Sequence, residues 1–141
     1  MGIGVGMLAS SSPEQEVTLS TGVTAVIVVV GVFFLGMGVY ALAAPQAILR
    51  PFDYVLKTAS SRAEVRGVYG GFGLAIAAVL AYAAVAPEVR TGVLVTVGAA
   101  LAGMAVGRAI SAVFDERTPF YPNWFYFLVE VIGAAAMFWA V

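Results

Sequence analysis

The residues of this chain that could do chemistry are few, and some of them interrupt long apolar runs. Glu130 is the only charged residue in Pro119–Val141, and Arg108 directly follows the uncharged run Thr91–Gly107. An ionised side chain at the centre of a membrane helix costs ~2.5–3.5 kcal/mol on insertion scales, so such residues usually pair or line a cavity. We therefore expect Arg108 and Glu130 either to form a structural ion pair or to line a polar pocket that binds a small molecule or transfers protons.

Further polar residues lie near this pair or at the start of another apolar run. Tyr126 shares a helix face with Glu130, and Ser111 shares one with Arg108, because residues three or four apart lie on one side of a helix. The segment Arg62–Gly71 contributes a second polar group. The charged residues of this segment have a simpler alternative interpretation. They could be residues at the membrane interface whose charged ends extend to water. The full predicted ligand-binding or ion-pair cluster is Glu64, Arg66, Tyr69, Arg108, Ser111, Tyr126 and Glu130.

The composition excludes several classes of site. The chain contains no cysteine and no histidine, which excludes thiolate and imidazole metal sites, haem ligation through histidine and a Ser-His-Asp triad. Its acidic residues show no cluster with the spacing of an oxygen-ligand metal site. The net charge is −1 and there is no basic tract, so nucleic acid is not an expected partner. We predict no metal and no cofactor.

The elements that must position these residues are membrane-spanning helices. The chain is 62% hydrophobic and 11% charged, with a mean hydropathy of +0.99, whereas soluble domains carry about 25% charged residues. Crossing the hydrocarbon core takes ~20 residues, and four apolar runs reach this length, at about 21–44, 63–86, 91–114 and 119–140. We predict an all-α, polytopic membrane protein, with an up-down four-transmembrane-helix bundle over residues 17–141 and a flexible tail over residues 1–16. The mixed residues of Gln46–Ser61 predict a short interfacial helix between the first two spans.

The basic residues predict the orientation of the bundle. Cytoplasmic loops carry an excess of Lys and Arg. Arg90 lies alone on one side of the predicted bundle, whereas the other side holds Arg50, Lys57, Arg62 and Arg117. The second side is therefore predicted to be cytoplasmic, with both termini periplasmic. This topology would bring the polar residues of three spans together in the cytoplasmic half of the bundle.

Small residues recur at every fourth position in two of the predicted spans. One ridge consists of Ala63, Gly67, Gly71 and Ala75, and the other of Ala99, Gly103, Gly107 and Ser111. Lipid gives little hydrophobic force between helices, so close backbone packing on such ridges stabilises membrane bundles. We predict that both ridges pack within the bundle. The alternative is a seam between copies of the chain.

The polar segments are similar to those of a known family. The likeness rests on Arg62-Ala63-Glu64-Val65-Arg66-Gly67-Val68-Tyr69-Gly70-Gly71, on Gly107-Arg108-Ala109-Ile110-Ser111, and on Asp115, Pro119 and Glu130, and it covers roughly residues 21–141. The chain resembles a family of small four-helix bacterial inner-membrane proteins catalogued as a domain of unknown function. The resemblance implies a bacterial inner-membrane location and a shared polar set that matches Glu64, Arg66, Tyr69, Arg108 and Glu130. It implies no particular activity, substrate or cofactor.

Three classes of function remain open from the sequence. The polar cluster could bind or transport a small amphipathic or lipid-like molecule. The small size and glycine-rich faces also suit an accessory or scaffold subunit of a larger membrane complex. Catalysis is the least favoured class, because Glu130 with Tyr69 or Tyr126 could do acid–base chemistry but nothing marks a nucleophile. The expected partners are the lipid bilayer, a small amphipathic ligand, and either copies of the chain or a larger complex.

Overall fold

The structure is a computed structural model that describes residues 13–141, and every regular element in this range is a helix. The elements in chain order are α1 (Pro13–Ala43), α2 (Pro45–Leu49), η1 (Arg50–Phe52), α3 (Ala59–Val65), η2 (Arg66–Gly71), α4 (Phe72–Val85), α5 (Pro87–Phe114), η3 (Phe120–Trp124) and α6 (Phe125–Trp139). The predicted all-α class is confirmed for the described residues. Residues 1–12 of the predicted tail lie outside them, and α1 already begins at Pro13.

Within residues 13–141, three helical segments are long and apolar enough to cross a membrane. They comprise 24, 27 and 28 residues, and they are Ser20–Ala43, Ala59–Val85 and Pro87–Phe114. The middle segment combines α3, η2 and α4, where η2 is a π-helical stretch within an otherwise α-helical rod. The prediction of a membrane protein is therefore supported by three segments that the sequence placed at nearly the same bounds.

The fourth apolar run forms a shorter helix than the sequence suggested. Helix α6 has 15 residues, or about 22 Å at 1.5 Å per residue, which is less than the ~30 Å of the hydrocarbon core. It continues from η3, but Tyr121 inside η3 has the non-helical angles φ −98° and ψ 133°. Regular α-helix therefore begins later than the predicted start of this span.

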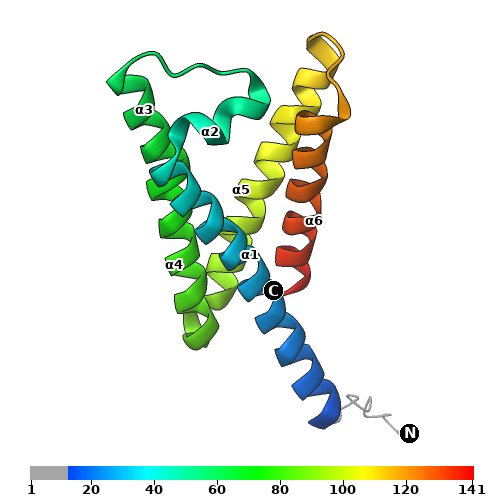
Figure 1. Cartoon of the computed structure of the whole chain (residues 1–141). Coiled ribbons are helices and arrows are strands. Elements are labelled where there is room, and N and C mark those ends of the chain that lie inside the picture. Colours follow the sequence, from blue (N-terminus) through cyan, green and yellow to red (C-terminus); the bar gives the residue numbers. More distant parts are fainter. Residues whose placement is uncertain (1–12) are drawn as a thin grey trace, which may run out of the picture.

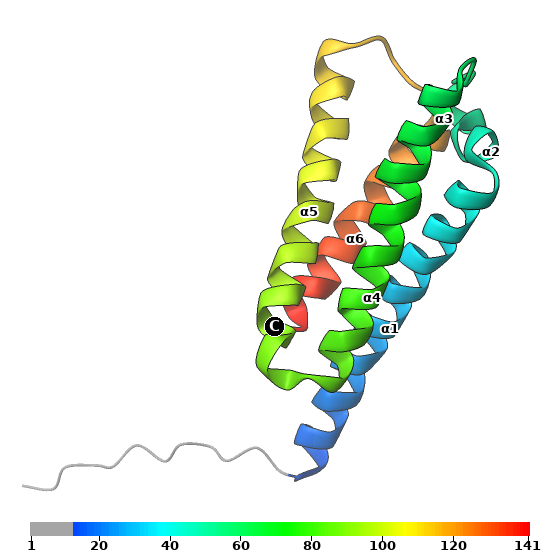
Figure 2. The same ribbon diagram turned by 90° about the vertical axis from the view of Figure 1, so that its left-hand side faces the viewer.

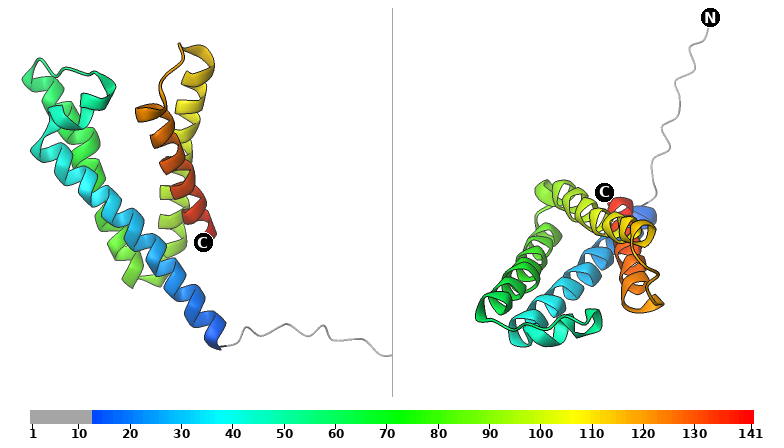
Figure 3. Two further views of the ribbon diagram at one scale, coloured as in Figure 1. Left: turned by 45° about the vertical axis from the view of Figure 1, so that its right-hand side comes forward. Right: turned by 90° about the horizontal axis from the view of Figure 1, so that it is seen from above.

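The helices are arranged as two pairs that meet at one end and diverge at the other (Figures 1 and 3). Helix α1 packs along η2 and α4, and α5 packs along α6. At the closed end α1 meets the end of α6 near Gly22, where an added Cβ would lie 3.0 Å from the Trp139 ring. The connected buried core comprises Ile27, Val30, Phe34, Leu80, Leu94, Val97, Leu101, Ala134, Met137 and Ala140.

Short connections and local caps hold this arrangement. Only Ala86 separates α4 from α5, and Pro87 opens α5 at a position where its missing N–H costs nothing. Helix α3 begins with a capping box in which Thr58 Oγ1 accepts from the Ser61 N–H at 3.1 Å. The side chain of Gln46 ties the loop after η1 to α2, because its amide donates to a loop carbonyl at 2.7 Å and accepts from a loop N–H at 2.7 Å.

Helices α1 and α4 cross at close backbone contact. A Cβ on Gly38 would lie 2.9 Å from the Leu74 backbone nitrogen, and one on Gly73 would lie 3.1 Å from the Gly38 Cα. Such distances leave no room for a side chain, so glycine is required at this crossing. Nearby, Arg66 Nε donates to the Leu42 carbonyl at 3.0 Å and ties η2 to α1.

The two predicted small-residue ridges do not form this crossing. All of their members are exposed, and a Cβ on Gly67, Gly103 or Gly107 would meet no atom within 4 Å. The prediction that both ridges pack within the bundle was therefore wrong. Four-residue spacing defines a stripe along a helix, but it does not say which way that stripe faces, and here the contact stripe lies on the opposite side of the rod, around Gly70 and Gly73.

Candidate functional site: a cavity between the helix pairs

A cavity of about 810 Å³ lies where the helix pairs diverge. Its walls come from the middle of α1, from α5 and from α6, and are mainly apolar, as at Phe34, Met37 and Leu101. The α2–η1 segment contributes Ile48 and Phe52 to the lining. The divergence of the two pairs therefore leaves a space that the connecting segment closes only in part.

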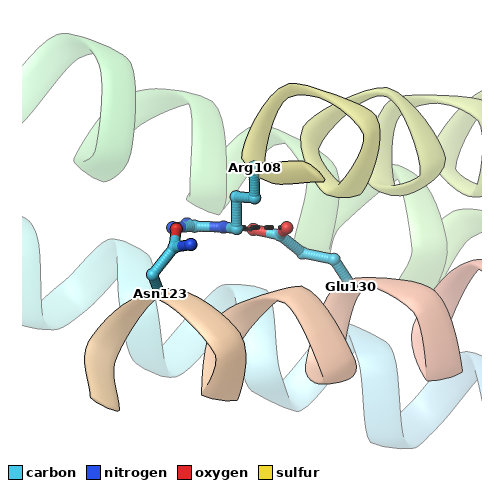
Figure 4. A network of polar contacts seen from close by, with 3 residues as sticks. All are labelled: Arg108, Asn123 and Glu130. Atoms are coloured by element: carbon cyan, nitrogen blue, oxygen red, sulfur yellow. Dashed lines mark hydrogen bonds and ion pairs between the residues drawn. The ribbon is translucent and has the colours of Figure 1, made fainter. Parts of the chain in front are cut away.

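The polar part of the cavity wall is an ion pair. Arg108 Nε on α5 donates to both carboxylate oxygens of Glu130 on α6, at 2.9 Å each. Arg108 Nη1 also reaches the Asn123 Oδ1 oxygen at 3.5 Å (Figure 4). The Glu130 side chain is only 5% exposed and that of Arg108 is 23% exposed. The carboxylate is thus buried with its counter-charge, whereas the guanidinium keeps partial access to open space.

Two aromatic rings cover the guanidinium. Arg108 Cζ lies 5.4 Å from the centre of the Tyr126 ring and 5.9 Å from that of Phe52, within the ~6 Å range of cation–π contacts. The two rings stack on each other, with centroids 5.8 Å apart and planes inclined by 27°. Since Phe52 belongs to η1 and Tyr126 to α6, this stack is a direct link across the mouth of the cavity.

The predicted cluster is only partly gathered in one place. Tyr69, Arg108, Tyr126 and Glu130 all line the cavity, and the expected ion pair between Arg108 and Glu130 is present. Ser111 lines a separate, more open groove of about 340 Å³ and donates to the Asp115 carboxylate instead. The groove shares Met104 and Arg108 with the larger cavity.

The remaining two predicted residues lie elsewhere. Arg66 binds the α1 backbone as described above, and the Glu64 side chain is exposed on α3. Neither residue lines the cavity or the groove. Glu64 forms no ion pair with the described residues. Their position fits the simpler interpretation of charged residues at the start of a span.

Sequence reasoning missed several residues that line the cavity. These are aromatic or polar side chains from η1, the following loop, α1 and η3, and they include Tyr40, Phe52, Tyr54 and Tyr121. A further member of the site, Asn123, contacts Arg108. The aromatic density around residues 120–126, which supply Tyr121 and Tyr126 to the lining, was a visible signal.

The polar side chains of the cavity can donate and accept hydrogen bonds. No group of three or more acidic residues among the described residues could hold a metal ion. The polar groups of the cavity are one ion pair and a set of phenols, which offer hydrogen bonds without an activated nucleophile.

Comparison with models of protein families identifies the family of this chain. The model of DUF4345, a domain of unknown function, matches residues 22–141. The chain belongs to this family. The DUF4345 region begins within α1 and includes both helix pairs, the ion pair and every residue that lines the cavity. No curated protein and no solved structure matches the chain. The predicted family resemblance is therefore confirmed, and the function has to be argued from the cavity itself.

Proposed function

We propose that this DUF4345 protein binds a small amphipathic or lipid-like molecule in the cavity between its helix pairs. The observation that carries the proposal is the cavity of about 810 Å³, whose mainly apolar wall contains one ion pair and several tyrosine hydroxyl groups. Small-molecule sites usually have volumes of about 300–1,000 Å³ and a few polar groups in an apolar lining. An amphipathic molecule matches this distribution, with its polar end at Arg108 and its apolar part along α1.

The proposal includes a four-span arrangement in a bacterial inner membrane. Helix α6 with η3 would form the fourth span, and α2 would lie in the headgroup layer. The connections α2–α3 and α5–η3 lie at one end of the molecule (Figure 2). They carry Arg50, Lys57 and Arg117, so this end would face the cytoplasm and both termini the periplasm.

Exposed apolar side chains beside the cavity support entry from the lipid. Val32 and Phe33 line the cavity, and they are 62% and 41% exposed on α1. In a bilayer these side chains would face acyl chains rather than water. A lipid-soluble molecule could therefore pass between the diverging helix pairs without crossing a polar barrier. Binding is the step that the cavity supports, and transport would need a flux measurement in vesicles.

The chain offers a clean test of the cavity. Gly36 on α1 lines it, and a Cβ added there would meet no atom within 4 Å. Gly36→Leu should therefore fill the space without a clash and even favour the helix, since glycine costs ~1 kcal/mol in a helix interior. Gly103→Leu on α5 is the matched control, because that site is equally open and lies outside the cavity.

The measurement is equilibrium binding of a neutral fluorescent lipophile to the protein in lipid nanodiscs. Gly36→Leu should weaken binding about tenfold or more, a change of ~1.4 kcal/mol or more, whereas Gly103→Leu should match the wild type. Equal binding by all three proteins, or no binding above that of empty nanodiscs, would refute the proposal.

The second candidate is an accessory or scaffold subunit of a larger membrane complex. The observation that favours it is the outward direction of both small-residue ridges, described above. Such ridges permit close helix packing in membranes, and the described residues of this chain leave them uncovered. Recovery of the protein with larger polypeptides after gentle extraction would favour this function, and recovery without them would count against it.

A further inference from the structure

We propose that the ligand of the cavity is a neutral, planar carbonyl compound with an apolar tail, which is the chemistry of an aromatic ketone or a quinone. This inference rests on the proposed function, because it names the ligand class of the same cavity. It follows from the charge of the site, from its unused hydrogen-bond donors and from the shape of its walls.

The lining of the cavity has no net formal charge. Arg108 and Glu130 are the only described lining residues with a formal charge, and these opposite charges pair at 2.9 Å. A charged ligand would lose its hydration without meeting a free counter-charge, which is strongly unfavourable in an apolar site. The cavity therefore selects a neutral molecule over a fatty acid or an amine.

The arginine of the ion pair has unused hydrogen-bond donors. A guanidinium has five N–H groups. The Nε–H of Arg108 donates to both carboxylate oxygens of Glu130, and one Nη1–H donates to Asn123 Oδ1. The Nη2 group makes no hydrogen bond within residues 13–141. Among the described side chains no buried nitrogen or oxygen lacks a partner, so Nη2 must reach open space. A ligand oxygen that accepts hydrogen bonds, such as a carbonyl, would satisfy these donors.

The walls next to these donors are flat. Phe52 and Tyr126 stack nearly parallel, and Tyr121 lies 6.2 Å from the Tyr126 ring centre. Aromatic faces pair favourably with other planar rings at centroid distances of 4.5–7 Å. The lining also includes Met37 and Met104, whose flexible side chains suit an apolar tail. A planar ring at the arginine with a tail along α1 fits both regions.

The test compares probes that share one decyl chain. Decylbenzoquinone is planar and neutral, decylbenzoate is planar and anionic, and decylcyclohexanone is neutral but not planar. Each competes with the fluorescent lipophile in nanodiscs that hold the wild-type, the Gly103→Leu or the Gly36→Leu protein. The difference between the two variants separates binding in the cavity from partition into lipid. We expect the quinone to bind about tenfold tighter than the benzoate and measurably tighter than the cyclohexanone.

A charge variant provides a second, independent readout. Glu130→Gln leaves Arg108 without its counter-charge, so the cavity gains one positive charge. Benzoate affinity should then rise about tenfold, and the ratio of benzoate to quinone affinity should rise with it. A damaged cavity would weaken both probes, so a gain for the anion cannot come from loss of structure.

The outcomes separate this inference from the proposed function. Benzoate binding at least as tightly as the quinone to the wild-type protein would overturn the inference, while the sensitivity of the fluorescent lipophile to Gly36→Leu would leave the proposed function standing. Equal binding of quinone and cyclohexanone would also overturn the inference. If Gly36→Leu changes the binding of neither the probes nor the fluorescent lipophile, both the inference and the proposed function fail. Should Glu130→Gln not fold, the ranking of the wild-type protein alone decides.

Discussion

The ion pair between Arg108 and Glu130 should make a measurable contribution to stability. Two unit charges about 4 Å apart attract by ~4 kcal/mol at an effective dielectric constant of 20, and the nitrogen–oxygen distance here is 2.9 Å. Removing one partner of a buried pair usually costs ~3–5 kcal/mol. Because the Arg108 side chain keeps 23% exposure, water would solvate it in part when it is unpaired. We expect Glu130→Gln to lower the free energy of unfolding by about 2–4 kcal/mol.

Adding Arg108→Gln to Glu130→Gln should restore part of the lost free energy of unfolding. Arg108→Gln together with Glu130→Gln replaces the pair by neutral amides, which leaves no buried charge without a partner. The double variant should therefore be more stable than additivity predicts, with a coupling free energy of about 2 kcal/mol. The assay is equilibrium unfolding in mixed micelles by added SDS, followed by tryptophan fluorescence.

The control is an exposed carboxylate on the same chain. Glu64→Gln on α3 changes charge in the same way, but that side chain has no ion-pair partner among the described residues, so its effect should stay within about 0.5 kcal/mol. A coupling free energy below ~0.5 kcal/mol between positions 108 and 130, the level expected of independent sites, would refute the reasoning about the pair.

Other parts of the account lead to further predictions. Gly38→Ala should lower the free energy of unfolding by about 1–3 kcal/mol, because its methyl group would press against the α4 backbone 2.9 Å away. Gly36→Ala, two residues along α1, should be neutral or stabilising, and equal losses for both would count against the close crossing. A reporter that is active only in the cytoplasm should be inactive when fused after Val141 and active when inserted between α5 and η3. The reverse pattern would invert the proposed orientation.

The fold was largely predictable because hydropathy is decisive in a membrane protein. Uncharged runs of about 20 residues have few alternatives to spanning helices, and three of the four predicted spans coincide with helices that are long and apolar enough to cross a membrane. The fourth was less predictable. Pro122 and the non-helical Tyr121 interrupt the helix start, and hydropathy does not report where the backbone departs from helical geometry.

The ion pair was predictable from depth and topology, whereas the cavity was not. Arg108 and Glu130 were assigned to the same half of the membrane by counting residues from the span ends, and a long side chain could bridge the rest. The contribution of Phe52 depends on how the loop after η1 folds back through Gln46. Such a contact depends on tertiary structure, and no local pattern marks it.

The main error of the sequence analysis was the prediction of which helix faces pack inside the bundle. Four-residue spacing identified the ridge through Gly103 and Gly107, but both positions face outward. The observed crossing uses Gly38 and Gly73, whose contact is visible only once both helices are placed. Lipid accepts almost any apolar face, so the hydrophobic pattern that orients helices in soluble proteins carries little information here.

The most direct test of whether the cavity binds a small molecule is native mass spectrometry of the protein extracted gently from its own membrane. We expect a small neutral molecule to remain bound to the wild-type protein and to the Gly103→Leu variant, and to be absent from the Gly36→Leu variant. Its mass would identify the ligand class. Wild-type protein that carries no small molecule and is recovered only with larger polypeptides would contradict the account and assign the protein to a complex instead.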